Sequence, residues 1–464
     1  MGSWIKQFLT YGIGLAIGIV LIGLILQHGS SSAPEARATA QATTMAGGGL
    51  FDALKANLAH PLSRLFVQLL VVIAAARATG ALFLKLGMPA VVGEMTAGIL
   101  LGPSLLGHLS PSAFAYIFPA DSIGALRLFS QIGICLFMFT VGMELKGEHL
   151  RHKVHSAVAV SHASIVVPFI LGTALATVLY DTLAGPQASF RAFALFIGIS
   201  LSITAFPVLA RILQERGMTH TPLGATAIAC AAVDDVTAWS IMAFVVAMSR
   251  SASLGGAAVS LLLALIFVAF MLMVVKRILP RVLDTKNSEP SSSTLAIVVC
   301  LLLAASLATE LIGIHALFGA FLAGVVMPDT GGFRERLRVR VEKFSSVMLL
   351  PLFFAFTGLR TEIGLMAGLH DWLICGLIVF LATAGKLGAT AVAARWTGLS
   401  WRDSLRLGAL MNTRGLMELI ALNIGYDLGI LSPQIFTMLV LMALVTTYMT
   451  GPLLTWFQRG NSRA

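Results

Sequence analysis

The chain has 464 residues, of which 57% are hydrophobic and only 11% are charged, and its mean hydropathy is +0.90. This composition excludes a soluble globular protein and indicates a membrane protein with many spans. A net charge of +10 would suggest a nucleic-acid partner in a soluble chain. Here the basic residues cluster in short loops between apolar runs, so we expect no nucleic acid and interpret them as topology signals.

The first apolar run, 11–27, follows Lys6 and leads into a polar linker that ends near residue 49. Within the linker, Ala38-Thr39-Ala40 resembles a processing site, so residues 1–49 are either a cleaved signal or a retained anchor. Residues 50–458 are expected to form the transmembrane domain, and 459–464 a short cytoplasmic tail.

Apolar runs that can cross a bilayer follow at about thirteen places, which predicts an all-α polytopic membrane protein. Their ranges are 62–84, 89–107, 123–145, 155–180, 190–213, 222–248, 255–277, 292–310, 312–328, 344–359, 371–395, 404–427 and 432–456. Lysine and arginine concentrate in alternate loops, such as 334–343, and are nearly absent from 108–122 and 426–434. The positive-inside rule therefore predicts a cytoplasmic C-terminus in the inner cell membrane, with lipid around the chain.

The four cysteines, Cys135, Cys230, Cys300 and Cys375, lie singly in apolar runs without C-x-x-C spacing. This pattern argues against disulfides and against a metal centre. No nucleophile and base are paired by a motif, so we expect neither an enzyme nor a cofactor.

An internal repeat relates the two halves of the chain. Gly93 to Gly98 recurs as Gly319 to Gly324, Leu136-Phe137 with Gly142 recurs as Leu352-Phe353 with Gly358, and the span around Ser202 recurs around Asn412. With 255–277 as connector, residues 62–248 and 292–456 form two six-helix units that run in opposite directions. Inverted repeats of this kind are typical of secondary transporters; chance similarity of Ala/Gly-rich helices is the alternative.

Two adjacent carboxylates, Asp234 and Asp235, lie halfway along the apolar run 222–248, with no lysine or arginine near them. One carboxylate at that depth costs about 2.5 to 3.5 kcal/mol on insertion scales, so we expect the pair to have a function. The alternatives are spectator acids in a water-filled vestibule and a pair that only ties helices together.

Polar residues also interrupt two other spans. Ser202 and Thr204 precede Pro207, which removes a backbone donor, and Asn412-Thr413-Arg414 lies at the matching place in the second repeat. They predict two broken helices that cross near the midplane, with Ser202 and Thr204 beside the ion and Asn412, Thr413 and Arg414 in support. The alternatives are a simple kink at Pro207 and, favoured for Arg414, a charge that ties helices without touching an ion.

Lys386 is the single charge in the apolar run 372–394. An ammonium at that depth needs an anion, and Asp234 and Asp235 are the candidates; a snorkelling lysine is the alternative. Glu94 and His315, at matching places in the two repeats, are expected mainly to satisfy neighbouring backbone.

A family resemblance is carried by five segments taken together, namely 93–103, 206–211, 232–236, 315–324 and 412–415. On them the chain resembles the second branch of the monovalent cation:proton antiporter superfamily, over roughly residues 62–456. The resemblance implies that Asp235 binds the cation or the proton, and that Asp234 pairs with a helix lysine, which by order and context is Lys386. It also implies a homodimer with a dimerisation domain and a mobile core.

The chain departs from the pattern of this family in two respects. The motifs look most like those of plant and bacterial cation/H+ exchangers thought to favour K+, where the pair often reads Asn-Asp, whereas Asp-Asp goes with electrogenic sodium exchange. The chain ends soon after the last span, so we expect no nucleotide-binding regulatory domain.

The sequence thus predicts a secondary active antiporter that exchanges Na+ or K+ for protons by alternating access and moves net charge. Cation and proton would compete for Asp235, with Asp234 as second ligand to the monovalent cation. The alternatives are a K+-selective electroneutral exchanger, a sodium-coupled symporter of organic anions, and a gated cation channel.

Overall fold

The computed structural model describes residues 57–58, 60–86, 88, 90–144, 154–218, 221–250, 254–283 and 290–458. The chain divides into two compact units, Met1–Phe66 and Val67–Ala464. The described residues of the first unit include the beginning of helix α4, and helices α5 to α22 belong to the second. The expected signal or anchor at 1–49, the loop 145–153 and the tail 459–464 lie outside the described residues.

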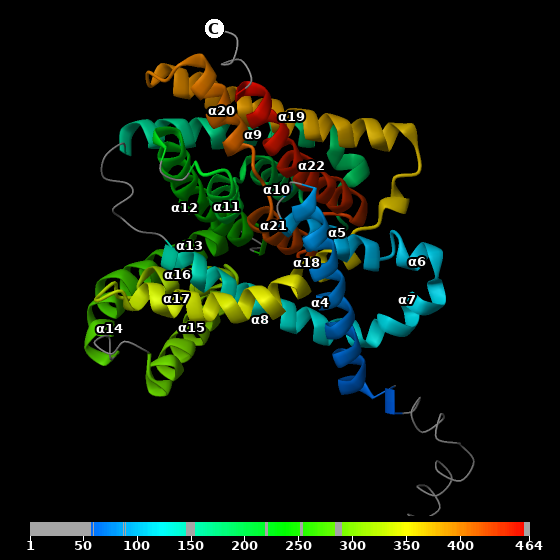
Figure 1. Ribbon diagram of the computed structural model, residues 1–464, viewed down its shortest axis with the longest axis horizontal. Coiled ribbons are helices and arrows are strands. Elements are labelled where there is room, and N and C mark those ends of the chain that lie inside the picture. Colours follow the sequence, from blue (N-terminus) through cyan, green and yellow to red (C-terminus); the bar gives the residue numbers. More distant parts are fainter. Residues whose placement is uncertain are drawn as a thin grey trace, which may run out of the picture. The chain divides into compact units, whose positions relative to one another are not determined.

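The described part of the chain consists of helices and the segments that connect them, with one isolated β-bridge between Ala184 and Leu431. Figure 1 shows the helices with the labels used below. They are α4 (Pro61–Lys85), α5 (Ala90–Leu101), α6 (Leu106–Leu109), α7 (Pro111–Ile117), α8 (Ala120–Glu144), α9 (Val154–Leu183), α10 (Phe190–Ser202), α11 (Phe206–Glu215), α12 (Pro222–Arg250), α13 (Leu254–Phe270), α14 (Lys276–Val282), α15 (Ser292–Ile312), α16 (Ala316–Val325), α17 (Phe333–Phe344), α18 (Leu350–Leu359), α19 (Leu369–Trp396), α20 (Trp401–Met411), α21 (Leu416–Asp427) and α22 (Pro433–Gln458).

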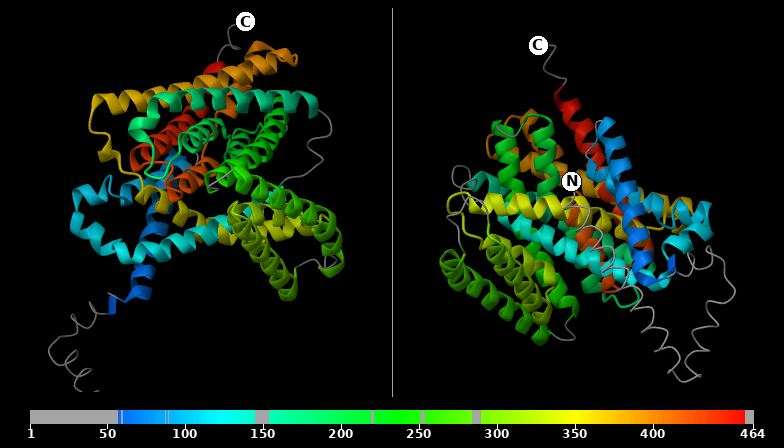
Figure 2. Two further views of the ribbon diagram at one scale, coloured as in Figure 1. Left: turned by 180° about the vertical axis from the view of Figure 1, so that it is seen from behind. Right: turned by 60° about the horizontal axis from the view of Figure 1, so that its bottom comes forward.

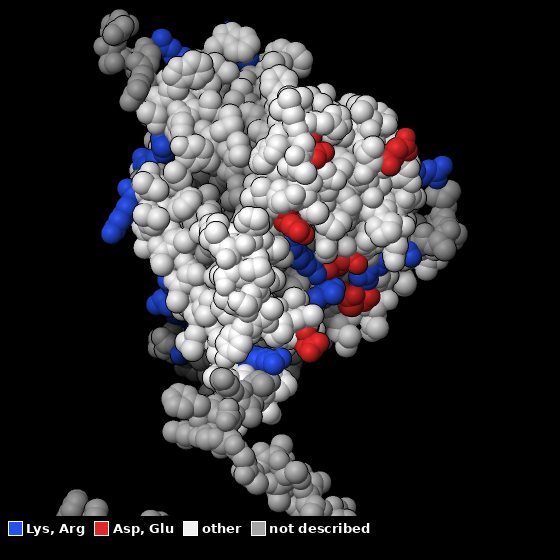
Figure 3. All heavy atoms as spheres, turned by 90° about the vertical axis from the view of Figure 1, so that its right-hand side faces the viewer, with Lys and Arg blue, Asp and Glu red and all other residues white. Residues whose placement is uncertain are grey.

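Within the described residues, nine helical stretches are long and apolar enough to cross a membrane. Large apolar side chains point outward from them, including Val178 and Leu311, which are 74% and 79% exposed. On the face shown in Figure 3 most of the surface is uncharged, with one mixed cluster of acidic and basic side chains and further lysine and arginine side chains along the left edge of the view. Such a surface suits lipid, so the expected all-α membrane protein is confirmed.

The nine spans are fewer than the expected thirteen because several expected spans are short or broken. The run 190–213 is split into α10 and α11, 404–427 into α20 and α21, and α5 and α16 have only 12 and 10 residues. A 12-residue helix is about 18 Å long, well short of the roughly 30 Å hydrocarbon core. These segments therefore need neighbours that shield their ends from lipid.

Both broken helices begin at a serine cap. The Ser189 side chain accepts a hydrogen bond from the Ala192 amide at the start of α10, and Ser400 does the same for Asp403 at the start of α20. Serine at this position satisfies one of the free amides of a first helical turn. Helices α10 and α20 thus share a serine cap at the start, and each ends at the break in its span.

The helices pack into two bundles. Helices α9–α12 and α19–α22 contact one another and form the site bundle, whereas α5, α8 and α15–α18 form the frame bundle. Figures 1 and 2 show α9, α19 and α22 together, with α8, α16 and α17 in a separate layer. Helix α13 contacts both α12 and α15 and so connects the two bundles.

Glycines bring helix backbones of the frame bundle into direct contact at two crossings. Gly142 of α8 meets Gly324 of α16, because a Cβ on either would overlap the partner helix, at the Phe321 or Phe139 carbonyl oxygen. Backbones that approach this closely at small residues are typical of tightly packed membrane helices.

The second crossing joins α5 and α18 in the same way, at Gly98 and Gly358, where a Cβ on Gly358 would overlap Gly98. These four glycines are the ones that the internal repeat pairs, Gly98 with Gly324 and Gly142 with Gly358. Each crossing thus joins one helix from each half of the chain.

A methyl group at a crossing should therefore destabilise the protein. We expect Gly142→Ala and Gly324→Ala each to lower the free energy of unfolding by about 1 to 3 kcal/mol, the usual effect of overpacking. Thermal unfolding of the purified protein in detergent, followed by size-exclusion chromatography, measures this. Gly124→Ala in the same helix α8 is the control, since an added Cβ there meets nothing within 4 Å. An unfolding temperature for Gly142→Ala equal to that of Gly124→Ala would contradict a tight crossing.

Candidate functional site

The site lies where the two broken helices of the site bundle cross. Between α10 and α11 the backbone is extended, with φ −67° and ψ 135° at Ile203. The amide of Ala205 donates a hydrogen bond to the Thr413 carbonyl at 3.0 Å, and the Thr204 hydroxyl oxygen lies 3.1 Å from the Met411 carbonyl oxygen. The non-helical segments 203–205 and 412–415 therefore hold each other at the places where polar residues interrupt the apolar sequence.

The end of α10 is covered by two cations. Its last carbonyls have no partner within the helix, and they carry the negative end of the helix dipole. Arg414 donates to the carbonyl of Ser200 at 2.6 Å and to that of Leu201 at 2.5 Å, while Lys386 donates to the carbonyl of Ser202. Both cations are completely buried, so their charge acts on these carbonyls without screening by water.

Asp234 is fully occupied by donors. Its carboxylate accepts hydrogen bonds from Ser161 at 2.5 Å, Ser164 at 3.1 and 3.2 Å, and Thr204 at 2.5 Å. It also forms an ion pair with Lys386 at 3.2 Å. Buried polar groups need such partners, and the ammonium of Lys386, which the sequence suggested as the partner of Asp234, is one of them.

Asp235 is different, although it is the next residue of α12. Its side chain is 1% exposed, yet neither carboxylate oxygen has a hydrogen-bond partner within the described chain. The backbone amide of Phe206, which opens α11, faces it without completing a hydrogen bond. A buried carboxylate without partners is costly as an anion, and a proton or a bound cation removes that cost.

The other predicted residues of the first break divide into two roles. Thr204 bridges the site, because its hydroxyl lies within hydrogen-bond distance of both Asp234 and the Met411 carbonyl. The Ser202 hydroxyl instead turns back to the Gly198 carbonyl at 2.7 Å. Ser202 therefore brings a carbonyl oxygen to Lys386 rather than a hydroxyl.

The second break supplies support from α22 and α21. Thr413 shares a hydrogen bond of 3.3 Å with Thr450, and the backbone amide of Arg414 donates to Thr447 at 3.2 Å. Arg414 also pairs with Glu418 at 3.3 Å, both fully buried. The interpretation of Arg414 as a charge that ties helices together fits these contacts.

Asn412 is completely buried at the same crossing, and neither polar atom of its side chain has a hydrogen-bond partner within the described residues. Together with Asp235, it leaves polar atoms of the crossing free to meet a ligand.

Three residues of the site were missed by the sequence reasoning, namely Ser161, Ser164 and Glu418. Ser161 and Ser164 are three residues apart on an apolar helix and so share one face of it. Glu418 follows Arg414 by four residues, the spacing of a helical ion pair. Both spacings were visible in the sequence and could have identified these side chains.

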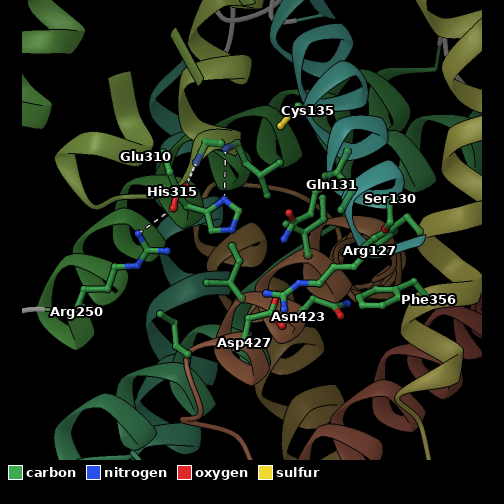
Figure 4. A pocket seen from close by; sticks show the side chains of 17 residues that line it. Arg127, Ser130, Gln131, Cys135, Arg250, Glu310, His315, Phe356, Asn423 and Asp427 are labelled. Carbon is green, nitrogen blue, oxygen red and sulfur yellow. Dashed lines mark hydrogen bonds and ion pairs between the residues drawn. The ribbon is translucent and has the colours of Figure 1, made fainter. Parts of the chain in front are cut away.

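Glu94 and His315 lie away from the crossing. Glu94 is buried in α5, and His315 caps α16, where its Nδ1 accepts from the Leu317 amide at 3.5 Å. Figure 4 shows the His315 side chain in a cavity beside Glu310. With φ 94° and ψ 138°, His315 adopts a backbone conformation that strongly favours glycine. The expected backbone role fits His315.

Residues 69–459 match the family described as "Sodium/hydrogen exchanger, transmembrane". The chain belongs to the sodium/hydrogen exchanger family. The expected membership of the cation:proton antiporter superfamily is thus confirmed, and the protein falls among membrane antiporters rather than enzymes.

Two curated members of the family are similar over most of the chain. The Na(+)/H(+) antiporter NhaS4 of Synechocystis is 42% identical over 392 residues, which are 84% of this chain and 96% of the relative. Cation/H(+) antiporter 20 of Arabidopsis thaliana is 42% identical over 411 residues, which are 85% of this chain. The chain spans only about half of that plant protein, 48% of its length.

A solved structure supports the fold alone. The sodium proton antiporter MjNhaP1 from Methanocaldococcus jannaschii superposes with a TM-score of 0.62 at 14% sequence identity, covering 86% of this chain and 97% of that one.

The Asp234–Lys386 pair makes the site testable by stability. Lys386→Met leaves a buried carboxylate without its cation, and we expect it to lower the free energy of unfolding by about 3 to 5 kcal/mol. The double variant Asp234→Asn, Lys386→Met removes both charges and should recover most of that loss. Unfolding temperatures of the two singles and the double form a double-mutant cycle. Additive losses in the double variant would show that the two side chains do not interact.

Proposed function

We propose that the protein is a secondary active antiporter that exchanges protons for Na+ or K+ at Asp235. The observation that carries the proposal is the charge balance of the crossing. Its buried ionisable groups are two cations, Lys386 and Arg414, and three carboxylic acids, Asp234, Glu418 and Asp235. Asp234 is paired with Lys386 and Glu418 with Arg414. Asp235 has no cation of its own among these groups, so the crossing is electrically neutral only when Asp235 binds one proton or one monovalent cation.

Competition for one carboxylate gives the exchange its coupling. A cation binds the ionised form of Asp235 and a proton neutralises it, so each ligand excludes the other. The Asp234–Lys386 pair and the Thr204 hydroxyl would hold the neighbouring oxygens in place and extend the cation's coordination. The family membership favours exchange over the symporter and channel alternatives.

Alternating access would come from motion of the site bundle against the frame bundle. We infer that the chain is built from two inverted six-helix repeats, 62–248 and 292–456, around the connector 255–277. The matching glycine crossings and the two breaks at equivalent places support this inference. We further infer a homodimer in the inner cell membrane with the C-terminus in the cytoplasm, as the resemblance and the loop charges imply.

The choice of cation stays between Na+ and K+ in this proposal. The name of the Synechocystis relative specifies sodium and that of the Arabidopsis relative a cation. The Asp234–Lys386 pair favours exchange that moves net charge, because release of Lys386 when a cation binds would let the lysine lose and regain a proton. A K+-selective electroneutral exchanger is the second candidate.

Replacing the leftover carboxylate tests the proposal directly. We expect Asp235→Asn to abolish the dissipation of a pH gradient by Na+, Li+ or K+ in proteoliposomes while the protein remains folded. In the wild type, the half-saturating cation concentration should rise as pH falls below the pKa of the site, approaching about tenfold per pH unit for competition with one proton.

Asp181→Asn, an exposed carboxylate at the end of α9, is the matched control and should keep full exchange. Substantial cation-driven proton movement by folded Asp235→Asn, or a half-saturating concentration that stays flat with pH, would contradict a shared site.

The first aspartate should decide whether transport moves charge. We expect wild-type protein to give transport currents on a solid-supported membrane, and Asp234→Asn, where active, to give much less charge per cation because its lysine partner is lost. Each net charge is worth about 2.3 kcal/mol per 100 mV of membrane potential. Equal charge per cation in both proteins would leave Asp234 with a structural role alone.

A further inference from the structure

A cavity lies on the seam between the two bundles, away from the crossing. Its volume is about 420 Å³, and its walls come from α12 and α21 of the site bundle and from α8, α15, α16 and α18 of the frame bundle. Figure 4 shows charged side chains reaching into it from both sides. Helices α12, α15 and α21 end here and α8 begins nearby, beside loops almost free of lysine and arginine. By that charge pattern, this is the non-cytoplasmic end of the protein.

The first set of contacts across the seam, here named the Asp427 clasp, consists of Asp427, Arg127 and Arg360. Asp427 at the end of α21 pairs with Arg127 of α8 at 3.2 Å and with Arg360, which follows α18, at 2.6 Å. Arg360 also donates to Asn423 of α21 at 2.9 Å. Its guanidinium lies 4.1 Å from the Phe356 ring centroid, which fixes it against the frame bundle.

The second set, the Glu310 clasp, consists of Arg250 and Glu310. Arg250 is the last residue of α12, and it pairs with Glu310 of α15 at 3.2 Å. The other oxygen of Glu310 accepts from the backbone amide of Ala316 at 2.9 Å. Glu310 is thus held by the start of α16, and Arg250 brings the aspartate-bearing helix α12 to it.

Elsewhere along the seam the two bundles also meet through apolar side chains. Trp239 of α12 meets Phe318 of α16 edge to face, with ring centroids 5.2 Å apart. Such contacts can shift against one another, whereas the hydrogen bonds of an ion pair at 2.6 to 3.2 Å break when its partners separate by a few ångströms. The two clasps are therefore charged contacts that must separate before this end of the seam can open.

We propose that the Asp427 clasp and the Glu310 clasp form the gate that closes the ion path on the non-cytoplasmic side, with the cavity between them as the closed vestibule. The proposal rests on the exchange function above. Movement of the site bundle that exposes Asp235 on this side separates Asp427 from Arg127 and Arg360, and Arg250 from Glu310. The closed seam then corresponds to a state whose ion path opens toward the cytoplasm.

A native thiol reports on the gate. Cys135 of α8 lines the cavity, Cys230 and Cys375 are buried, and Cys300 is exposed. In a Cys300→Ser background, the rate at which a membrane-impermeant maleimide labels Cys135 in intact cells measures how often this end opens. We expect Asp427→Asn and Arg250→Gln each to raise that rate by about threefold to tenfold, where tenfold corresponds to 1.4 kcal/mol.

Salt provides a second readout that packing defects do not imitate. Arg127 and Arg250 are 44% and 31% exposed, so salt screens their pairs. Labelling of the parent should accelerate as choline chloride, whose cation is not a proposed substrate, rises from about 0.05 to 0.5 M, and the double variant Asp427→Asn, Arg250→Gln should be fast and nearly insensitive to salt. Asp121→Asn, an exposed acid in the first turn of the same helix as Arg127, is the control and should match the parent.

Two outcomes would overturn the gate. One is parental labelling of Cys135 in both single variants when both elute as folded protein. The other is labelling that is equally salt-sensitive in the parent and the double variant. The readout needs no transport, so a protein that labels as expected but exchanges no cations would contradict the antiporter function and leave the gate intact.

Discussion

The C-terminal end of helix α10 sets the conditions for the rest of the site. A helix that stops inside the membrane leaves carbonyls that neither water nor lipid can satisfy. Arg414 and Lys386 supply the donors, and both are completely buried. Two buried cations then need counter-ions, which Glu418 and Asp234 provide. The unpaired carboxylate of Asp235 stands beside a structure whose other buried charges are already balanced, which is why we propose it as the group that binds the proton or the cation.

The sequence was sufficient to identify the charged centre of this arrangement. Asp234, Asp235, Lys386 and Arg414 each interrupt an apolar run, and a charge in such a place is too costly to be incidental. The two breaks were visible for a related reason, since Pro207 and Gly415 follow hydroxyl and amide side chains in otherwise apolar spans. The free-energy cost of a charged side chain in an apolar span depends on its neighbours in the chain, so the sequence alone reveals it.

The hydrogen-bond and ion-pair partners of these side chains could not be predicted from the sequence in the same way. Ser202 and Ser164 look alike in sequence, yet only Ser164 directs its hydroxyl to Asp234, whereas Ser202 uses its hydroxyl to satisfy its own helix. Which alternative wins depends on the distance between α9 and α12, which no single segment encodes. The cavity clasps raise the same difficulty, because Asp427 meets Arg127 and Arg360 from helices that are distant in the chain.

The glycine crossings of the frame bundle also bear on how such proteins diverge. Where α8 meets α16 and α5 meets α18, the fit is made by backbone atoms, which every residue type shares. The shape is specified by the lack of a side chain at four positions, and surrounding residues that face lipid need only remain apolar. A frame built in this way tolerates extensive replacement of its sequence. This is one physical route by which an arrangement of helices persists at 14% identity with a TM-score of 0.62.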